Sequence, residues 1–190
     1  MLRNTRLSYG WIAIVFHWTI AVLIIGQWGL GWTMEHLVGP RLAFGLIQWH
    51  KSFGLLILAL ALLRLSWRLI NPRPRLPEGM SLFEKLAAGS VHRGLYWLMI
   101  LLPLSGWALI SASVLEIPTY TFYLFVMPDL PLERSDAAEA FWTTAHIVIG
   151  WFLLVIVAIH VLAALRHHFL LRDSVLKQMV RPASQSLTEQ

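Results

Sequence analysis

The 190-residue chain contains no cysteine, and this absence removes several kinds of site at once. Without thiols it can form no disulfide, hold no iron–sulfur cluster and offer no thiolate to zinc. The Cys-x-x-Cys-His motif is missing too, so any haem would not be attached covalently in the c-type manner. The sequence also lacks His-Glu-x-x-His, which excludes the usual metalloprotease helix.

Charged residues are scarce. They make up only 13% of the chain, whereas 57% of residues are hydrophobic and the mean hydropathy is +0.64. Four apolar segments, approximately residues 12–33, 52–70, 95–112 and 141–165, approach the length of about 20 residues that crosses a hydrocarbon core of roughly 30 Å. The alternating segments of a membrane β-barrel are absent. We therefore predict an all-α, integral membrane four-helix bundle, with residues 1–190 forming a single domain.

The basic residues are distributed unevenly around these segments. Most of them flank one side of the predicted bundle. They lie before the first segment, around the connection between the second and third, and after the fourth: Arg3, Arg6, Arg64, Arg68, Arg73, Arg75, Lys85, Arg93, Arg166, Arg172, Lys177 and Arg181. The positive-inside rule therefore predicts that both termini are cytoplasmic. Basic residues that flank membrane spans give no support to a nucleic-acid partner, and lipid is the expected surrounding.

Four histidines lie inside or beside the apolar segments: His17, His50, His146 and His160. Ionisable side chains are costly in hydrocarbon, so such residues are candidates for function. His146 and His160 are fourteen residues apart, which is about 21 Å of helix and within about 40° of whole turns. They should therefore share a helix face near opposite sides of the bilayer. Depth then predicts the pairs His17 with His160 and His50 with His146.

Two histidines at each depth favour haem iron as the cofactor. Zinc requires four ligands, or three and a water molecule, and no Asp, Glu or Cys lies nearby. Haem iron needs only axial ligands, and two histidines would leave no open position, which suits electron transfer. We predict two stacked, non-covalent haems, with these four histidines as the metal ligands. For any single histidine, the alternative is a hydrogen bond between helices or a place at the membrane interface.

Other residues near the histidines have two interpretations each. Arg64 follows His50 by fourteen residues and is suited to the propionates of the inner, cytoplasmic-side haem, and Lys51 to those of the outer haem. The alternative for Arg64 is a side chain that extends to the cytoplasmic interface. Gly54 and Gly150 each follow a histidine by one helical turn, which leaves room for a flat macrocycle or for close helix packing.

A series of short motifs runs along the chain: Phe16-His17-Trp18, residues 50–55 (HKSFGL), 63–68 (LRLSWR), 92–96 (HRGLY) and 102–107 (LPLSGW), then His146 through Gly150 to His160, and finally His167-His168-Phe169 with Arg172-Asp173. In this order they resemble the bacterial cytochrome b561 family, which is related to the dihaem cytochrome b subunits of formate dehydrogenases and nickel hydrogenases. The resemblance covers nearly the whole chain.

The resemblance implies four helices, two non-covalent b haems with His17, His50, His146 and His160 as axial ligands, and a place in the bacterial inner membrane. It also implies electron exchange with ubiquinone. His92, at the start of the third segment, would then hydrogen-bond a propionate or a quinone headgroup near the inner haem; the alternative is an interfacial histidine.

The sequence indicates the haem ligands more clearly than it indicates the electron donor. Some family members resemble superoxide oxidases, which pass an electron from periplasmic superoxide to quinone. The long loop of the predicted outer surface is acidic on balance, with Glu116, Asp129, Glu133, Asp136 and Glu139 against Arg134. Such a surface repels an anion unless Lys51, Arg41 or the haem region focuses a local positive field, so general electron transfer to quinone is the preferred prediction. The alternatives are an anchor subunit that serves a hydrogenase or dehydrogenase partner, and a non-redox transporter that uses histidines as proton relays.

Overall fold

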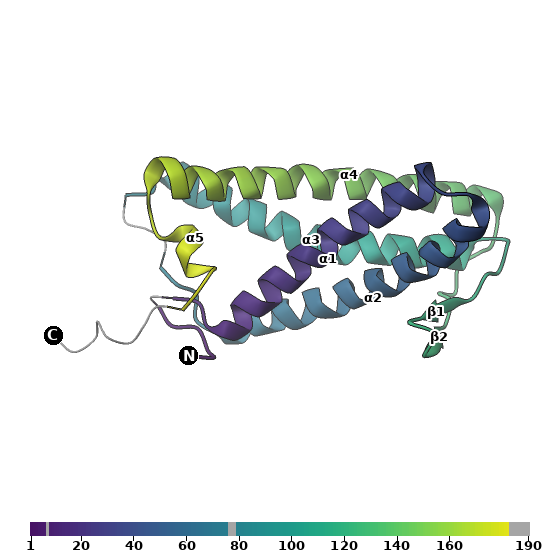
Figure 1. The fold of residues 1–190 in the computed structure, drawn as a ribbon, viewed down its shortest axis with the longest axis horizontal. Helices are drawn as coiled ribbons and strands as arrows, with labels where there is room; N and C mark the ends of the chain where they lie inside the picture. The colour runs from purple at the N-terminus through teal and green to yellow at the C-terminus, as the bar shows by residue number, and fades with distance from the viewer. Residues whose placement is uncertain (7, 76–78, 183–190) are drawn as a thin grey trace.

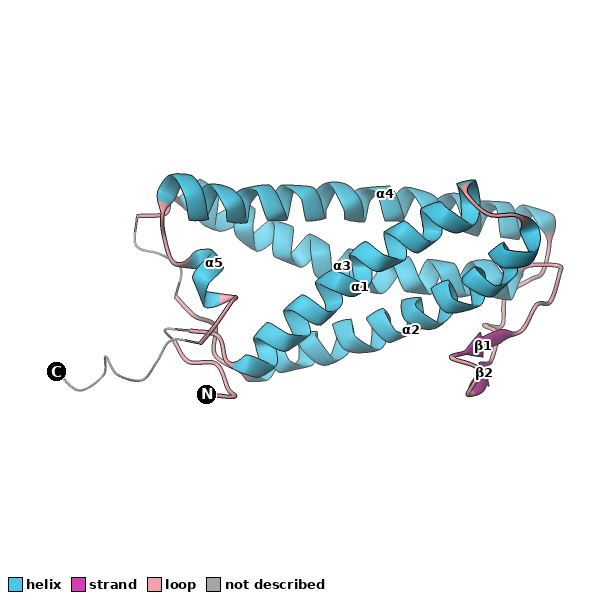
Figure 2. Ribbon diagram, viewed as in Figure 1, coloured by secondary structure: helices cyan, strands magenta, loops and turns pink. Residues whose placement is uncertain are grey.

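The computed structural model describes residues 1–6, 8–75 and 79–182. Its main elements are four long helices, α1 (Trp11–His36), α2 (Pro40–Ile70), α3 (Leu82–Ala112) and α4 (Asp136–Arg166). A small hairpin of β1 (Thr119–Thr121) and β2 (Phe125–Met127) follows α3 and precedes α4 in the sequence, and it lies beside α2 (Figures 1 and 2). A π-helical turn, η1 (His167–Leu171), and the short helix α5 (Val175–Gln178) follow α4. The predicted all-α four-helix bundle is confirmed, with the hairpin as a minor addition.

Three of the helices begin earlier than the sequence predicted. α2 begins at Pro40 rather than near residue 52, α3 at Leu82 rather than near 95, and α4 at Asp136 rather than near 141. Hydropathy detects only the turns that lie in hydrocarbon, whereas the capping signals lie further out. Proline favours the first turn of α2, and Ser81 forms a capping box with Glu84 at the start of α3.

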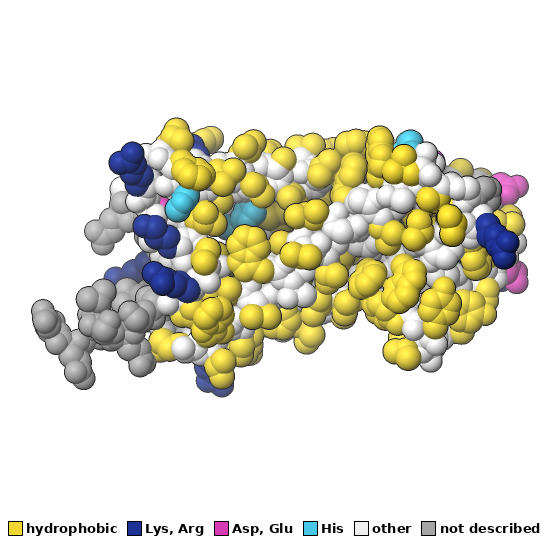
Figure 3. Space-filling model, viewed as in Figure 1, with side chains coloured by type: hydrophobic (Ala, Val, Ile, Leu, Met, Phe, Trp, Pro, Cys, Tyr) yellow, Lys and Arg dark blue, Asp and Glu magenta, His cyan; other side chains and the backbone are white. Residues whose placement is uncertain are grey.

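The outer surface of the bundle is largely apolar, as a membrane protein requires. Large hydrophobic side chains point outward along each long helix, among them Ile25 (69% exposed), Trp97 (65%) and Phe152 (61%). All four helices are long and apolar enough to cross a membrane. Figure 3 shows hydrophobic side chains over the middle of the molecule and basic side chains gathered toward one end. Water would not tolerate so large an apolar surface, so lipid covers it.

One end of the bundle carries most of the basic residues, and we call it the basic end. The start of α1, the end of α2, the start of α3 and the end of α4 all lie there, and the hairpin lies at the opposite end (Figure 1). α5 closes the basic end, because the Trp18 indole donates a hydrogen bond to the Met179 carbonyl at 2.7 Å. Tyr9 lies just before α1, and burial raises the pKa of its phenol despite the nearby Arg68.

A small buried layer joins all four helices at the middle of the bundle. It consists of Ile20 from α1, Ala61 from α2, Met99 from α3 and Leu153 from α4. Leu153 is midway along α4 between His146 and His160. The apolar layer therefore separates the bundle into two levels, each with its own histidines.

Candidate functional site

The four intramembrane histidines meet in two pairs, each joining α4 to another helix. The ring centroids of His17 on α1 and His160 on α4 are 6.0 Å apart, with an angle of 68° between the ring planes. Those of His50 on α2 and His146 on α4 are 6.1 Å apart, at 79°. These are the pairs that depth along the helices predicted. We call His17–His160 the inner pair, near the basic end, and His50–His146 the outer pair.

The spacing within each pair is that of two imidazoles on opposite sides of one metal ion. A metal–imidazole bond is about 2 Å long, so two rings that share a metal through facing nitrogens have centroids about 6 Å apart. Within the described ranges, no group of three or more His, Asp or Glu side chains forms a metal-binding cluster. Two-ligand sites of this kind fit haem, because the porphyrin supplies the remaining iron ligands.

His146 is held in one orientation by α3. Its Nδ1 lies 3.1 Å from the Leu102 carbonyl oxygen and 3.1 Å from Ser105 Oγ. The Ser105 hydroxyl itself donates to the Leu102 carbonyl at 2.7 Å. With two acceptors beside it, Nδ1 carries the hydrogen, and the lone pair of Nε2 is left for a metal. Gly106 makes room for the ring, since a Cβ there would lie only 3.0 Å from His146 Cε1.

His50 has a less complete set of hydrogen bonds. Among the residues that the structure describes, its Nδ1 is buried without a hydrogen-bond partner, and so is Oε1 of the neighbouring Gln27. The Gln27 amide donates to the His50 backbone carbonyl at 2.7 Å, so α1 contacts α2 at this level. A buried polar atom without a partner is destabilising, and this site therefore has the capacity for further hydrogen bonds.

Arg64 lies at the inner pair, as the spacing from His50 predicted. Its Nη1 donates to His17 Nδ1 at 3.0 Å, and its guanidinium carbon is 5.9 Å from the centre of the Tyr96 ring. A guanidinium can only donate, so Nδ1 of His17 is the acceptor in this arrangement. His92 on α3 lies beside the pair, with its ring 5.2 Å from that of His160. That distance is shorter than the spacing of about 6 Å for a shared metal, so His17 fits better as the partner of His160.

The remaining predicted site residues lie near the outer pair. Lys51 is half-buried and forms no hydrogen bond or salt bridge among the described residues, although the Asp129 carboxylate interacts with it electrostatically. A Cβ at Gly54 would lie 3.7 Å from Gln27 Nε2, and one at Gly150 would lie 3.8 Å from Leu102 Cδ1. Both glycines therefore face a neighbouring helix, as the close-packing interpretation expects.

Gln27, Ser105 and Gly106 were not predicted as site residues. The sequence held a signal for the first, because a glutamine inside a long apolar segment needs a hydrogen-bond partner. The role of Ser105 and Gly106 depends on how α3 packs against α4, which a single sequence does not show.

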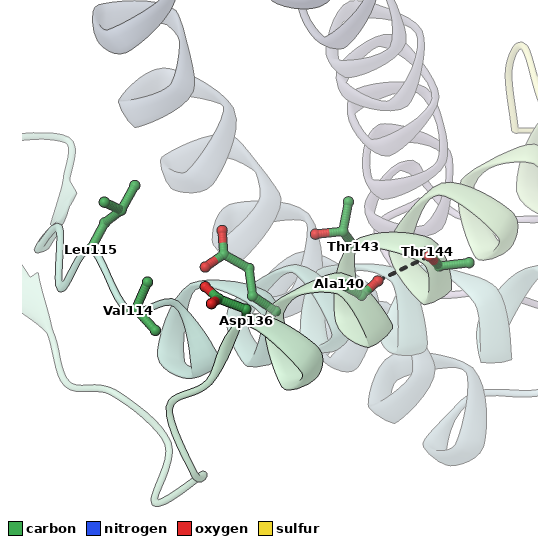
Figure 4. Close-up of a pocket in the computed structure, with 7 residues that line it drawn as sticks. Val114, Leu115, Asp136, Ala140, Thr143 and Thr144 are labelled. Atoms are coloured by element: carbon green, nitrogen blue, oxygen red, sulfur yellow. Dashed lines mark hydrogen bonds between the residues drawn. The ribbon is translucent and has the colours of Figure 1, made fainter.

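An open pocket at the hairpin end is separate from both pairs. It is lined by residues of the loop after α3 and the first turns of α4: Val114, Leu115, Asp136, Glu139, Ala140, Thr143 and Thr144 (Figure 4). None of these is a histidine, and the Thr144 hydroxyl donates to the Ala140 carbonyl within its own helix. The carboxylates lie at the N-terminus of α4, where the helix dipole favours them without a ligand.

Comparison with known proteins decides the family. A family model described as prokaryotic cytochrome b561 matches residues 8–182. The chain belongs to the prokaryotic cytochrome b561 family. It is similar to cytochrome b561 homolog 2 of Escherichia coli K12, with 32% identity over 95% of each chain. The predicted resemblance is thus confirmed, and the protein is a membrane cytochrome that holds b-type haem.

Two further relatives are more distant. One is named probable superoxide oxidase CybB, from Yersinia pestis, with 27% identity over 91% of this chain and 96% of the relative. Another is cytochrome b562 of Cereibacter sphaeroides, with 25% identity over 92% of this chain and 96% of the relative.

Gly106→Val should lower the haem content of the purified protein. A branched side chain there would displace the His146 ring, because even the first added carbon meets it at 3.0 Å. The measurement is haem absorbance per mole of protein. Gly94→Val is the matched control on the same helix, since a Cβ at Gly94 meets nothing within 4 Å. Full haem content in Gly106→Val would contradict this account of the outer pair.

Proposed function

We propose that this cytochrome carries two b haems and moves electrons, one at a time, between a donor and the ubiquinone pool. The observation that carries the proposal is the pair of 6 Å histidine contacts on α4, from His146 and His160 fourteen residues apart. His17 and His160 would hold the inner haem, and His50 and His146 the outer haem. When bound, haem iron would supply reversible one-electron chemistry, and a site held by two histidines would suit electron transfer better than oxygen binding.

The protein divides the transfer of an electron across the membrane into two steps, one at each histidine pair. The two levels are about 21 Å apart along α4. The layer of Ile20, Ala61, Met99 and Leu153 keeps them apart and excludes water from the middle of the bundle. Low polarity around the sites, together with the charges at their edges, would set the two reduction potentials.

Arg64 has a specific part in this arrangement. If His17 binds iron through Nε2, its Nδ1 must carry the hydrogen and can no longer accept one from Arg64. Arg64 would then turn to the haem propionates, which accept bidentate hydrogen bonds from a guanidinium. Lys51, half-buried and without a salt bridge in the described part of the chain, is suited to the propionates of the outer haem.

The basic end would face the cytoplasm of a bacterial cell, which places both termini inside and the hairpin outside the inner membrane. The concentration of basic residues at that end supports this orientation. His92 lies beside the inner pair, where it is suited to hydrogen-bond a propionate or a quinone headgroup. Ubiquinone would thus be reduced or oxidised near the inner haem.

Superoxide is a second candidate donor, because a relative with 27% identity is named as a probable superoxide oxidase. The charges at the hairpin end favour it less. Arg134 is already paired with Glu116 and Asp129, each at 2.7 Å, and Glu133, Asp136 and Glu139 add negative charge. Such a surface slows the approach of an anion. A hydrogenase or dehydrogenase partner is the other candidate donor. Family membership favours electron transfer, whether from quinol, superoxide or a partner enzyme, over a non-redox transporter.

Haem counting in histidine variants tests the assignment of ligands. His50→Ala and His146→Ala should each lose the outer haem, and the double variant should lose no more. His17→Ala and His160→Ala should each lose the inner haem, because one axial ligand is removed in each case. The readout is haem per protein together with the redox titration of the haem that remains. His36→Ala, which alters an exposed histidine at the end of α1, is the control. The pairing is wrong if His50→Ala and His160→Ala empty the same site.

Arg64→Ala should retain both haems and lower the midpoint potential of the inner one. A positive charge about 10 Å away disfavours the oxidised state by about 1.7 kcal/mol at an effective dielectric constant of 20, which is on the order of 70 mV for a one-electron couple. Arg93→Ala is the control. It removes a positive charge at the same end of the bundle, but the Arg93 side chain donates a hydrogen bond to Ser90 on its own helix. Equal shifts in the two variants, or none, would exclude the propionate role.

The donor can be identified with the purified protein alone. We expect ubiquinol to change the haem absorption bands without any added protein, since the proposed quinone site belongs to this chain. Superoxide generated in the same solution tests the second candidate. If neither reagent affects the bands while a chemical reductant does, the cytochrome depends on a partner enzyme, and independent quinone exchange is ruled out.

A further inference from the structure

The hairpin between α3 and α4 exposes apolar and aromatic side chains. From Ile117 to Met127 the chain carries no charged residue. At the tip, Tyr123 is 60% exposed, Leu124 82% and Phe125 55%. Thr121 pairs with Phe125 across the strands, so these side chains lie on the turn or next to it. A loop that faced only water would not gather such residues at its tip.

The backbone of the turn is strained. Phe122 has φ 49° and Tyr123 has φ 57°, both in the left-handed region that bulky side chains avoid. Glycine or asparagine would be the ordinary choice at such positions. A turn with glycine or asparagine would close the hairpin without this strain. Two adjacent aromatic residues in this conformation therefore indicate that the tip has a function.

The hairpin is fixed to α2 by two buried polar side chains. Gln48 donates to the Pro118 carbonyl at 3.1 Å and accepts from the Tyr120 N–H at 3.2 Å. Ser52 Oγ accepts from the Phe122 N–H at 2.9 Å. Both side chains are about 1% exposed. The position of the tip relative to the membrane-spanning helix is thus determined by specific hydrogen bonds.

The length of α2 is consistent with an attachment at the edge of the hydrocarbon core. Gln48 is twenty residues from Arg68 along α2, which is about 30 Å of helix and equals the thickness of the core. If Arg68 marks the inner boundary, Gln48 lies at the outer one. Figure 1 shows the hairpin projecting sideways from the bundle rather than continuing along its length. A hairpin that projects sideways at that depth would extend over the bilayer surface.

The lipid-facing surface of α2 continues onto the hairpin. Trp49 belongs to a membrane-spanning helix and is 41% exposed. Its ring lies 6.1 Å from that of Tyr123 and 6.0 Å from that of Phe122. The charged residues on either side of the hairpin are tied together instead, because Arg134 pairs with Glu116 and with Asp129. Charge is thereby kept at the base of the hairpin and away from its tip.

We propose that the hairpin is an interfacial anchor whose tip, formed by Tyr123, Leu124 and Phe125, inserts into the surface of the lipid bilayer. Tyrosine is suited to the headgroup level, with an apolar ring and a polar hydroxyl, and leucine and phenylalanine to the acyl boundary. With no charge at the tip, binding depends on apolar burial and not on lipid charge. The anchor does not rest on the electron-transfer proposal.

Spin labelling can test the depth of the tip, because the chain has no native cysteine. Leu124→Cys carries the label in haem-loaded protein reconstituted into phosphatidylcholine vesicles, and Phe125→Cys repeats the measurement at the next position. The readout is the accessibility of the label to oxygen, which concentrates in lipid, relative to a water-soluble nickel chelate. Ile25→Cys on the lipid-facing side of α1 and Glu133→Cys on the exposed loop are the two references. An unchanged haem spectrum confirms that each variant is folded.

The anchor predicts oxygen-to-nickel ratios at positions 124 and 125 close to that at position 25 and well above that at position 133. Ratios equal to that at position 133 would place the tip in water and overturn the proposal. So would labels shielded from both reagents, because a second copy of the chain or another protein would then cover the tip. Vesicles with added anionic lipid should give the same ratios, and a strong dependence on lipid charge would also contradict an uncharged anchor.

Discussion

A bilayer offers no hydrogen bond to an imidazole, and this constraint explains most of the architecture. Four histidines lie within helices whose outer surfaces are apolar, so each ring must turn inward and find its partners in the protein. They meet in two pairs, and α4 contributes one member to each. The helices must therefore cross closely enough at two levels to hold the rings about 6 Å apart.

The two levels are supported differently. At the outer level, α3 fixes His146 through Leu102 and Ser105, while Nδ1 of His50 has no partner. At the inner level, Arg64 occupies Nδ1 of His17, and His92 adds a third ring beside His160. If each pair holds a haem, these different surroundings would give the two sets of ligands different basicity and the two sites different nearby charges. A difference in potential between the two levels is a natural consequence, and it would give electron flow a direction.

At the outer level, opposite faces of α2 contact α4 and the hairpin. His50 points toward α4, while Gln48 and Ser52, two residues before and after it, hold the hairpin from the other side of the helix. A displacement of the hairpin would therefore be transmitted to the segment that carries His50. Anchoring the hairpin in the bilayer would restrain that segment and, with it, the orientation of the imidazole.

Much of this could be predicted from the sequence because it depends on local patterns. Apolar runs revealed four helices, and helical spacing placed His146 and His160 at two depths. The early starts of α2 and α3 were missed because polar turns beyond the hydrocarbon continue each helix. Ser105 and the turn at Phe122 and Tyr123 depend on contacts between distant segments, as with Gln48 and Pro118. A single sequence contains no direct signal for such contacts.

The most direct test of the central claim is a haem count on the unmodified protein, combined with electron paramagnetic resonance of its oxidised form. Two histidine pairs predict two haems per chain, both low-spin, because each iron would be held by two histidines, which are strong ligands. One haem per chain, or a high-spin signal from an iron with an open position, would contradict the account.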